Sequence, residues 1–115
     1  MSRDDERSRR IGMNESLFRN VNEQLESLTV RFRDNATTLE LVCECGDPEC
    51  DAPLRVDRDE YERTRRNPVL FLVIPGHEIA DVEEIVASGD GFDIVRKREG
   101  APAAVARATD PRDAG

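Results

Sequence analysis

The chain has 115 residues, of which 37% are charged and 4% aromatic, and its formal net charge is −8. This length predicts one small domain with a thin hydrophobic core, the kind of domain that a metal or a disulfide often stabilises. The acidic charge argues against nucleic-acid binding, and no apolar run approaches the ~20 residues of a membrane helix.

Residues 1–13 are charged and show no periodicity, and we expect them to form a disordered arm. In residues 14–33 apolar side chains recur at spacings of three and four, which predicts an amphipathic helix with Asn14 as its N-cap. The apolar positions are Leu17, Phe18, Val21, Leu25, Leu28 and Phe32. The free face of this helix could support a homo-oligomer.

Residues 37–45 alternate between apolar and polar side chains, as in a half-buried strand. One face of this strand would carry Leu39, Leu41, Cys43 and Cys45, and the other Thr38, Glu40 and Glu44. A short strand at 53–56 is expected to pair with it, and a short helix is expected at 57–66.

Residues 69–74 form a continuous apolar run that predicts a buried strand. Segments 82–87 and 92–97 flank an Asp-Gly turn signal and are predicted to form a hairpin, although a short helix suits 82–87 equally well. Residues 99–115 are rich in Ala, Pro, Asp and Gly and are expected to be a disordered tail. The fold class is therefore α+β over residues 14–98, with one long and one short helix packed on a small, mostly antiparallel sheet.

All cysteines lie close together in the sequence, at Cys43, Cys45 and Cys50. Side chains two apart on a strand point the same way, so Cys43 and Cys45 share a face, and a bend at Gly46 could bring back the third thiol. An odd number of cysteines argues against a closed disulfide framework. The pattern favours a zinc site, while burial of the thiols as small apolar side chains is the alternative.

Zinc in structural sites takes four ligands, and the chain contains a single histidine, His77. It follows the strand expected at 69–74, and neighbouring strands lie only about 4.8 Å apart. We therefore predict one zinc ion held by Cys43, Cys45, Cys50 and His77. The open alternatives for the fourth ligand are water or an acid of the cysteine loop: Asp47, Glu49 or Asp51.

A closed shell of three thiolates and one imidazole leaves no position for a catalytic water, and no nucleophile–base or phosphate-loop motif is visible. We therefore expect a non-enzymatic binding or regulatory protein that carries structural zinc and contacts a protein partner. One alternative is a thiol redox switch that releases zinc on oxidation. Another is a nucleic-acid-binding zinc module, which the acidic surroundings of the cysteines disfavour. Reduced thiols and the lack of a signal-peptide pattern predict a cytoplasmic location.

Two stretches carry a resemblance to a known family. They are Val42-Cys43-Glu44-Cys45 with Cys50, and Phe71-Leu72-Val73-Ile74-Pro75-Gly76-His77. Together with Asn14-Glu15-Ser16-Leu17-Phe18-Arg19 and a helix centred on Tyr61, they resemble a family of small uncharacterised, zinc-binding-like proteins of high-GC Gram-positive bacteria. The resemblance spans residues 14–98 and implies a bacterial cytoplasmic setting, without implying any catalytic residue.

Overall fold

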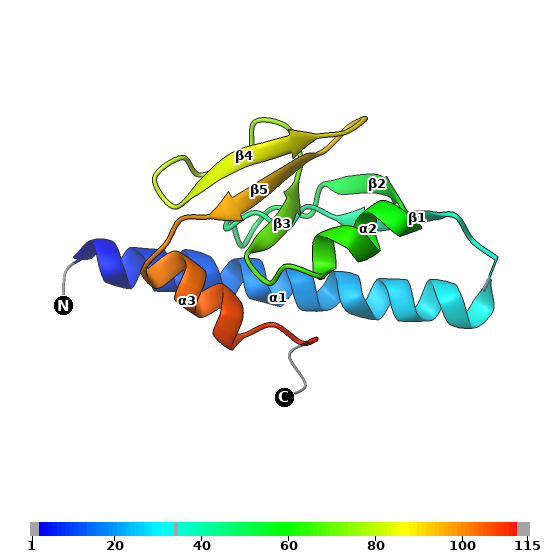
Figure 1. Cartoon of the computed structure of the whole chain (residues 1–115), viewed down its shortest axis with the longest axis horizontal. Helices are drawn as coiled ribbons and strands as arrows, with labels where there is room; N and C mark the ends of the chain where they lie inside the picture. The colour runs from blue at the N-terminus through cyan, green and yellow to red at the C-terminus, as the bar shows by residue number, and fades with distance from the viewer. Residues whose placement is uncertain (1–2, 34, 113–115) are drawn as a thin grey trace.

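The computed structural model describes residues 3–33 and 35–112, which form an α+β fold as the sequence predicts (Figure 1). Its elements are, in chain order, α1 (Arg3–Phe32), β1 (Thr38–Val42), β2 (Pro53–Asp57), α2 (Arg58–Arg65), β3 (Leu70–Val73), β4 (Glu83–Ser88), β5 (Asp93–Lys97) and α3 (Ala101–Ala108). Among the described residues, no helix combines the length and apolar character that crossing a bilayer requires.

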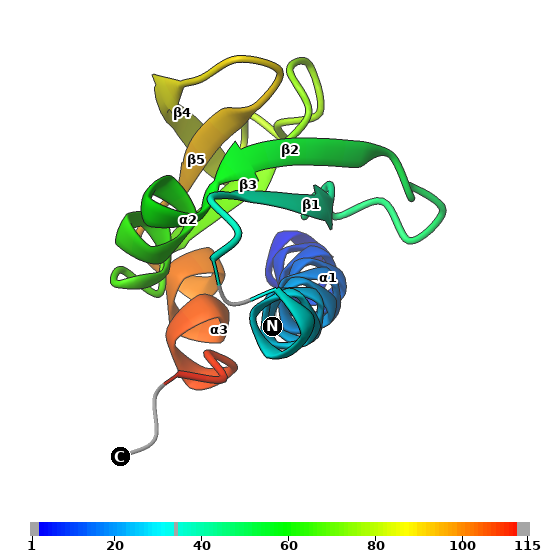
Figure 2. The same ribbon diagram turned by 90° about the vertical axis from the view of Figure 1, so that its right-hand side faces the viewer.

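The long helix α1 extends under the whole molecule, with the strands on one side of it and α3 beside it (Figures 1 and 2). Strands β1 and β2 pair antiparallel, with Thr38 opposite Asp57 and Val42 opposite Pro53. Strands β3, β5 and β4 form a second antiparallel sheet in that order. The predicted pairing of the first two strands is thus confirmed. The segment that contains β4 forms a hairpin with β5, as predicted, and not the alternative helix.

The hydrophobic core consists of two neighbouring clusters. One lies around β1 and β2 and contains Leu39, Leu41, Leu54, Val56, Tyr61, Leu72, Phe92 and Ile94. The other lies between β3, β5 and α3 and contains Cys43, Cys45, Val69, Phe71, Val73, Val95, Ala103 and Ala106. Two of the three cysteines are therefore part of the core.

Both ends of the chain contain more structure than their composition predicts. Residues 3–13, expected to be part of a disordered arm, form the first turns of α1, so Asn14 is an interior helical residue and no N-cap. Residues 101–108, expected to be part of a disordered tail, form α3. The two helices approach closely because Gly12 has no side chain: an added Cβ would lie 2.8 Å from Cγ1 of Val105. The outermost parts of the predicted arm and tail, 1–2 and 113–115, lie outside the described residues.

The face that α1 turns toward the core is polar. Its buried side chains at spacings of four, three and four are Glu15, Arg19, Asn22 and Glu26. Arg19 shows how such a face is accommodated, because its guanidinium stacks on Phe71 and donates hydrogen bonds to the backbone carbonyl oxygens of Pro68 and Ala106. The apolar periodicity in the sequence correctly predicts a helix, but most of the apolar positions prove to be exposed.

A buried ionic cluster joins α1 to the three-stranded sheet. The ammonium of Lys97 contacts the carboxylates of Glu15 and Glu83, and the exposed fractions of all three side chains are at most 1%. Burial, followed by the neighbouring Glu83 carboxylate, raises the pKa of Glu15 well above its ordinary value of 4.5, against the opposing effect of Lys97. Folding therefore favours the protonated form of Glu15, which the native state keeps to a higher pH than the unfolded chain does.

This proton makes stability fall with rising pH. The stabilisation is complete below pH 4.5, where both states are protonated, and it is lost as the pH rises through the raised pKa of native Glu15. Glu15→Gln keeps the size of the side chain but cannot ionise, so its free energy of unfolding should decline less with pH. Urea unfolding at a series of pH values measures this, with the exposed Glu6→Gln as control. Parallel pH profiles of wild type and Glu15→Gln would refute the prediction.

Candidate metal centre

Four potential metal ligands meet where the two sheets approach each other. Cys43 and Cys45 follow β1, Cys50 precedes β2, and His77 lies in the turn after β3. Their ligand atoms all lie within 4.8 Å of one another, which is close enough to hold a metal ion. The predicted grouping of these residues is therefore present in the structure.

Two of the separations between the ligand atoms agree with tetrahedral coordination. Nδ1 of His77 lies 3.5 Å from Sγ of Cys43 and 3.6 Å from Sγ of Cys50. An ion with metal–sulfur bonds of ~2.3 Å and a metal–nitrogen bond of ~2.0–2.1 Å would separate these atoms by about 3.6 Å in a tetrahedral site. Nδ1 is therefore the nitrogen of His77 that lies in position to bind an ion together with Cys43 and Cys50.

Backbone hydrogen bonds hold the segment after β1 between the two sheets. The amide of Cys43 donates to the carbonyl of Ala52 (2.9 Å), which extends the pairing with β2. The amide of Glu44 donates to the carbonyl of Leu72 in β3 (2.8 Å). The amide of Ile74 donates to Sγ of Cys43 (3.2 Å), a contact that would favour the thiolate form of this sulfur. The first two ligands are therefore positioned by both sheets.

Glu44 and Asn22 support this segment from within the protein. Glu44 was expected on the solvent face of the strand but is buried, and its carboxylate accepts hydrogen bonds from the Asn22 side chain (2.7 Å) and the Leu72 amide (3.0 Å). The Asn22 side chain also donates to the carbonyl of Val42 (2.8 Å) and accepts from its amide (2.9 Å). These two residues fix the chain just before and between Cys43 and Cys45.

Sequence reasoning missed the role of Asn22. The available signal was its spacing from Glu15 and Arg19, which places all three on one face of the helix. Polar residues at that spacing predict a solvent-exposed helix face equally well, because the sequence does not show their partners on other elements.

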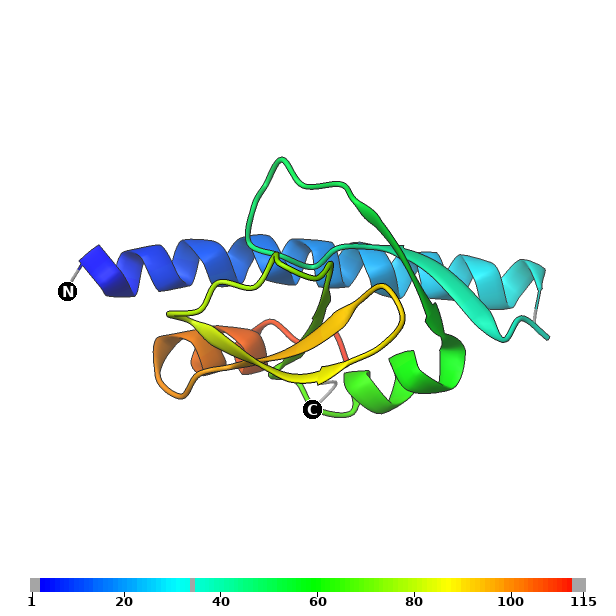
Figure 3. The ribbon, with the colours of Figure 1, turned by 90° about the horizontal axis from the view of Figure 1, so that it is seen from above.

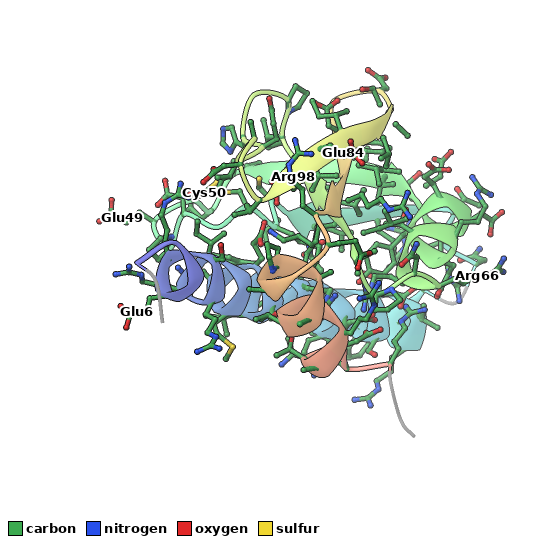
Figure 4. The ribbon with its side chains drawn as sticks, turned by 60° about the vertical axis from the view of Figure 1, so that its left-hand side comes forward. Glu6, Glu49, Cys50, Arg66, Glu84 and Arg98 are labelled. Atoms are coloured by element: carbon green, nitrogen blue, oxygen red, sulfur yellow. The ribbon has the colours of Figure 1, made fainter. Side chains whose placement is uncertain are left out.

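The loop between β1 and β2 extends across α1 and presents Cys50 (Figures 3 and 4). A turn at Asp47 shapes it: the carboxylate of Asp47 accepts from the amide of Glu49 (3.0 Å), and its carbonyl from the amide of Cys50 (3.1 Å). The acids considered as alternative fourth ligands, Asp47, Glu49 and Asp51, are exposed and lie outside the cluster that the described residues form. His77 is therefore the fourth member of the group.

Gly46 is required in this loop for space. Its φ is not in the positive range, so the bend does not depend on the conformational freedom of glycine. An added Cβ would lie 2.5 Å from Cγ2 of Ile11 and 3.1 Å from Cδ1 of Ile79. Gly46 thus lets the loop pack directly against α1 and against the segment after His77.

Gly46→Ala should destabilise the domain by about 1–3 kcal/mol, because the methyl group overpacks a closed contact. Chemical unfolding measures the loss, with Glu49→Ala, an exposed change in the same loop, as the control. Equal stability of the two variants would show that Ile11 and Ile79 can move aside freely.

The cluster is partly enclosed. Cys43 and Cys45 are buried, Cys50 and His77 are half-buried, and a small hollow lined by Cys45, Asp47, His77 and Ile79 opens beside them. Burial raises the pKa of both Cys43 and Cys45 above its ordinary value. A bound cation would offset this cost of ionising buried thiols, so the site combines soft donor atoms with a protected position for a metal ion.

A scan against protein-family models found no match to the sequence, and neither did searches of the curated proteins and of the solved structures. The donor atoms and their geometry are therefore the basis for assigning a function.

Proposed function

We propose that this protein is a small non-enzymatic binding domain in which Cys43, Cys45, Cys50 and His77 hold one structural zinc ion. The observation that carries the proposal is the agreement between the sulfur–nitrogen distances of 3.5 and 3.6 Å and the tetrahedral value of about 3.6 Å.

Zinc suits this donor set better than an iron–sulfur cluster, calcium or magnesium does. Three sulfurs and one imidazole nitrogen are a common ligand set of structural zinc sites, whereas iron–sulfur clusters are usually held by four cysteines. Calcium and magnesium prefer oxygen ligands. Four protein ligands would also complete the coordination shell of zinc and leave no position for a catalytic water. This supports a structural role over a catalytic one.

The ion would cross-link three separate parts of the chain. It would join the end of β1, the start of β2 and the turn after β3, adding to the hydrogen bond from Glu44 to Leu72 that connects the two sheets. Structural zinc in finger peptides binds with apparent free energies of about 10–16 kcal/mol, so such a link can decide whether a small domain folds.

Metal content tests this assignment. Protein purified without added zinc should carry one zinc ion per chain by native mass spectrometry. His77→Ala should reduce the zinc content, whereas Glu49→Ala and Asp51→Ala, which remove two of the three exposed acids of the same loop, should leave it unchanged. Wild-type protein without metal, even after reconstitution with zinc, would contradict the proposal.

The loop surface supports a protein partner with basic character. The exposed side chains around the site include Asp47, Glu49 and Asp51, and no Lys or Arg occurs between Asp34 and Leu54. Such an acidic rim repels phosphate polymers and attracts basic protein surfaces. A cytoplasmic location, where thiols stay reduced, is part of the same proposal.

A redox switch is the second candidate, and the closeness of the sulfurs together with the partial exposure of Cys50 favours it. Hydrogen peroxide would take two electrons from two thiolates, which form a disulfide and release zinc, while peroxide and two protons become two water molecules. Peroxide should then release zinc in a chromogenic chelator assay, and a thiol reductant should restore binding. Zinc that stays bound at a peroxide concentration sufficient to oxidise free thiols would refute the switch.

A further inference from the structure

The outward face of α1 carries a stripe of five apolar residues and one exposed glutamine, which we call the outer stripe: Met13, Leu17, Val21, Gln24, Leu28 and Phe32. Its five apolar side chains are between 38% exposed (Val21) and 77% exposed (Phe32). Viewed along α1, the strands lie on one side of the helix and α3 beside it, and no other described element covers the remaining side (Figure 2). The stripe is therefore largely open to solvent within the described chain.

The orientation of α1 is the reverse of that expected for a helix on the surface of a monomer. Such a helix normally buries its apolar face, whereas α1 buries Glu15, Arg19 and Asn22 and exposes the outer stripe. At ~150–200 Å² for a fully exposed side chain of this size, the five apolar residues expose about 500 Å² per chain. Two copies of the stripe would together bury roughly 1,000 Å², the area at which a specific interface becomes plausible.

The spacing of the stripe is self-complementary. Its positions are separated by 4, 4, 3, 4 and 4 residues, a pattern that reads the same in both directions. A two-fold axis at the centre of the stripe, between Asn22 and Glu23, would place Met13 against Phe32, Leu17 against Leu28, and Val21 against Gln24 of a second copy. An isologous contact requires this kind of symmetry, in which the same patch faces itself in the opposite direction.

The surroundings of the stripe suit the antiparallel arrangement. A hollow between α1 and β1, lined in part by Leu28, Phe32 and Ala36, lies at the end where Met13 of a second copy would arrive. Arg31 would face Asn14, and Arg10 would lie beyond the end of the other helix, so these arginines would not oppose each other. In a parallel pair, by contrast, each of these arginines would face the same arginine of the second chain. We propose that the outer stripe is the interface of an antiparallel homodimer.

The mass of the intact protein in solution tests the dimer. Light scattering should give twice the chain mass of 13.0 kDa for wild type, and the single chain mass for the double variant Leu17→Glu with Leu28→Glu. Ile85→Glu makes the same change at an exposed apolar residue of β4 and should stay dimeric. Circular dichroism and zinc content should remain as in wild type for both, which separates this test from that of the metal site. Wild-type protein that is monomeric at ~100 µM would overturn the proposal. Binding of that monomer to lipid vesicles would not rescue it, because the outer stripe would then contact a membrane instead of a second copy.

A charge exchange tests the direction of pairing. In the antiparallel dimer, Leu17→Glu combined with Leu28→Lys sets the introduced glutamate of each chain against the introduced lysine of the other, so dimerisation should recover relative to the double glutamate variant. In a parallel dimer the same variant would oppose like charges. If it stays as monomeric as the double glutamate variant, the antiparallel register is wrong.

Discussion

Removal of the metal should lower the melting temperature of the wild-type protein by about 20 °C or more. The sulfurs of Cys43 and Cys45 belong to the second core cluster, and the ion would connect the segments that join the two sheets. A loss of only 5 kcal/mol would shift the midpoint of a domain of this size by roughly 20 °C, and structural zinc can contribute more. Thermal unfolding followed by circular dichroism, before and after treatment with a strong chelator, measures the effect.

A variant that cannot complete the site is the control for this experiment. Cys45→Ser should melt at the temperature of the chelated wild type, and the chelator should not lower it further. Re-addition of zinc should restore the wild-type midpoint and leave the variant unchanged. Identical melting of wild type with and without chelator, with the metal shown to be absent, would mean that no ion supports the fold.

Lys97→Met should destabilise the protein by about 3–5 kcal/mol, because it leaves the buried carboxyl groups of Glu15 and Glu83 facing each other without the cation that both contact. Urea unfolding measures the loss. Arg96→Met, an exposed change at the neighbouring position of β5, is the matched control and should cost little. Adding Glu15→Gln to the lysine variant should recover part of the stability, since one of the two buried acids can then no longer ionise.

The effect of Lys97→Met should also depend on pH. The variant should regain stability in acid, where protonation of Glu15, whose pKa burial already raises, removes one of the charges that the missing cation would balance. A loss similar to that of Arg96→Met, or the same loss at every pH, would show that the ion pairs with Glu15 and Glu83 do not support the fold.

The strands and the grouping of the cysteines could be predicted because they depend on local patterns. Alternation identified the strand that contains Leu39 and Leu41, and an Asp-Gly turn signal identified the hairpin. His77 could be predicted to lie near the cysteines, because it directly follows a buried strand that was expected to lie beside the segment that carries them.

Other features depended on contacts that local patterns do not reveal. The polar inner face of α1 is stable because partners such as Lys97 and Phe71 come from distant segments. Helix α3 is rich in alanine, and its packing depends on a close approach to Gly12 rather than on large apolar side chains. The burial of Glu44 likewise depends on Asn22. Composition and periodicity reveal none of these contacts between residues that are far apart in the sequence.

X-ray absorption at the zinc edge of the purified wild-type protein tests the central claim most directly. The account predicts one zinc ion with three sulfur neighbours at ~2.3 Å and one nitrogen neighbour at ~2.0–2.1 Å. A shell dominated by oxygen, or a protein that retains no zinc, would contradict it.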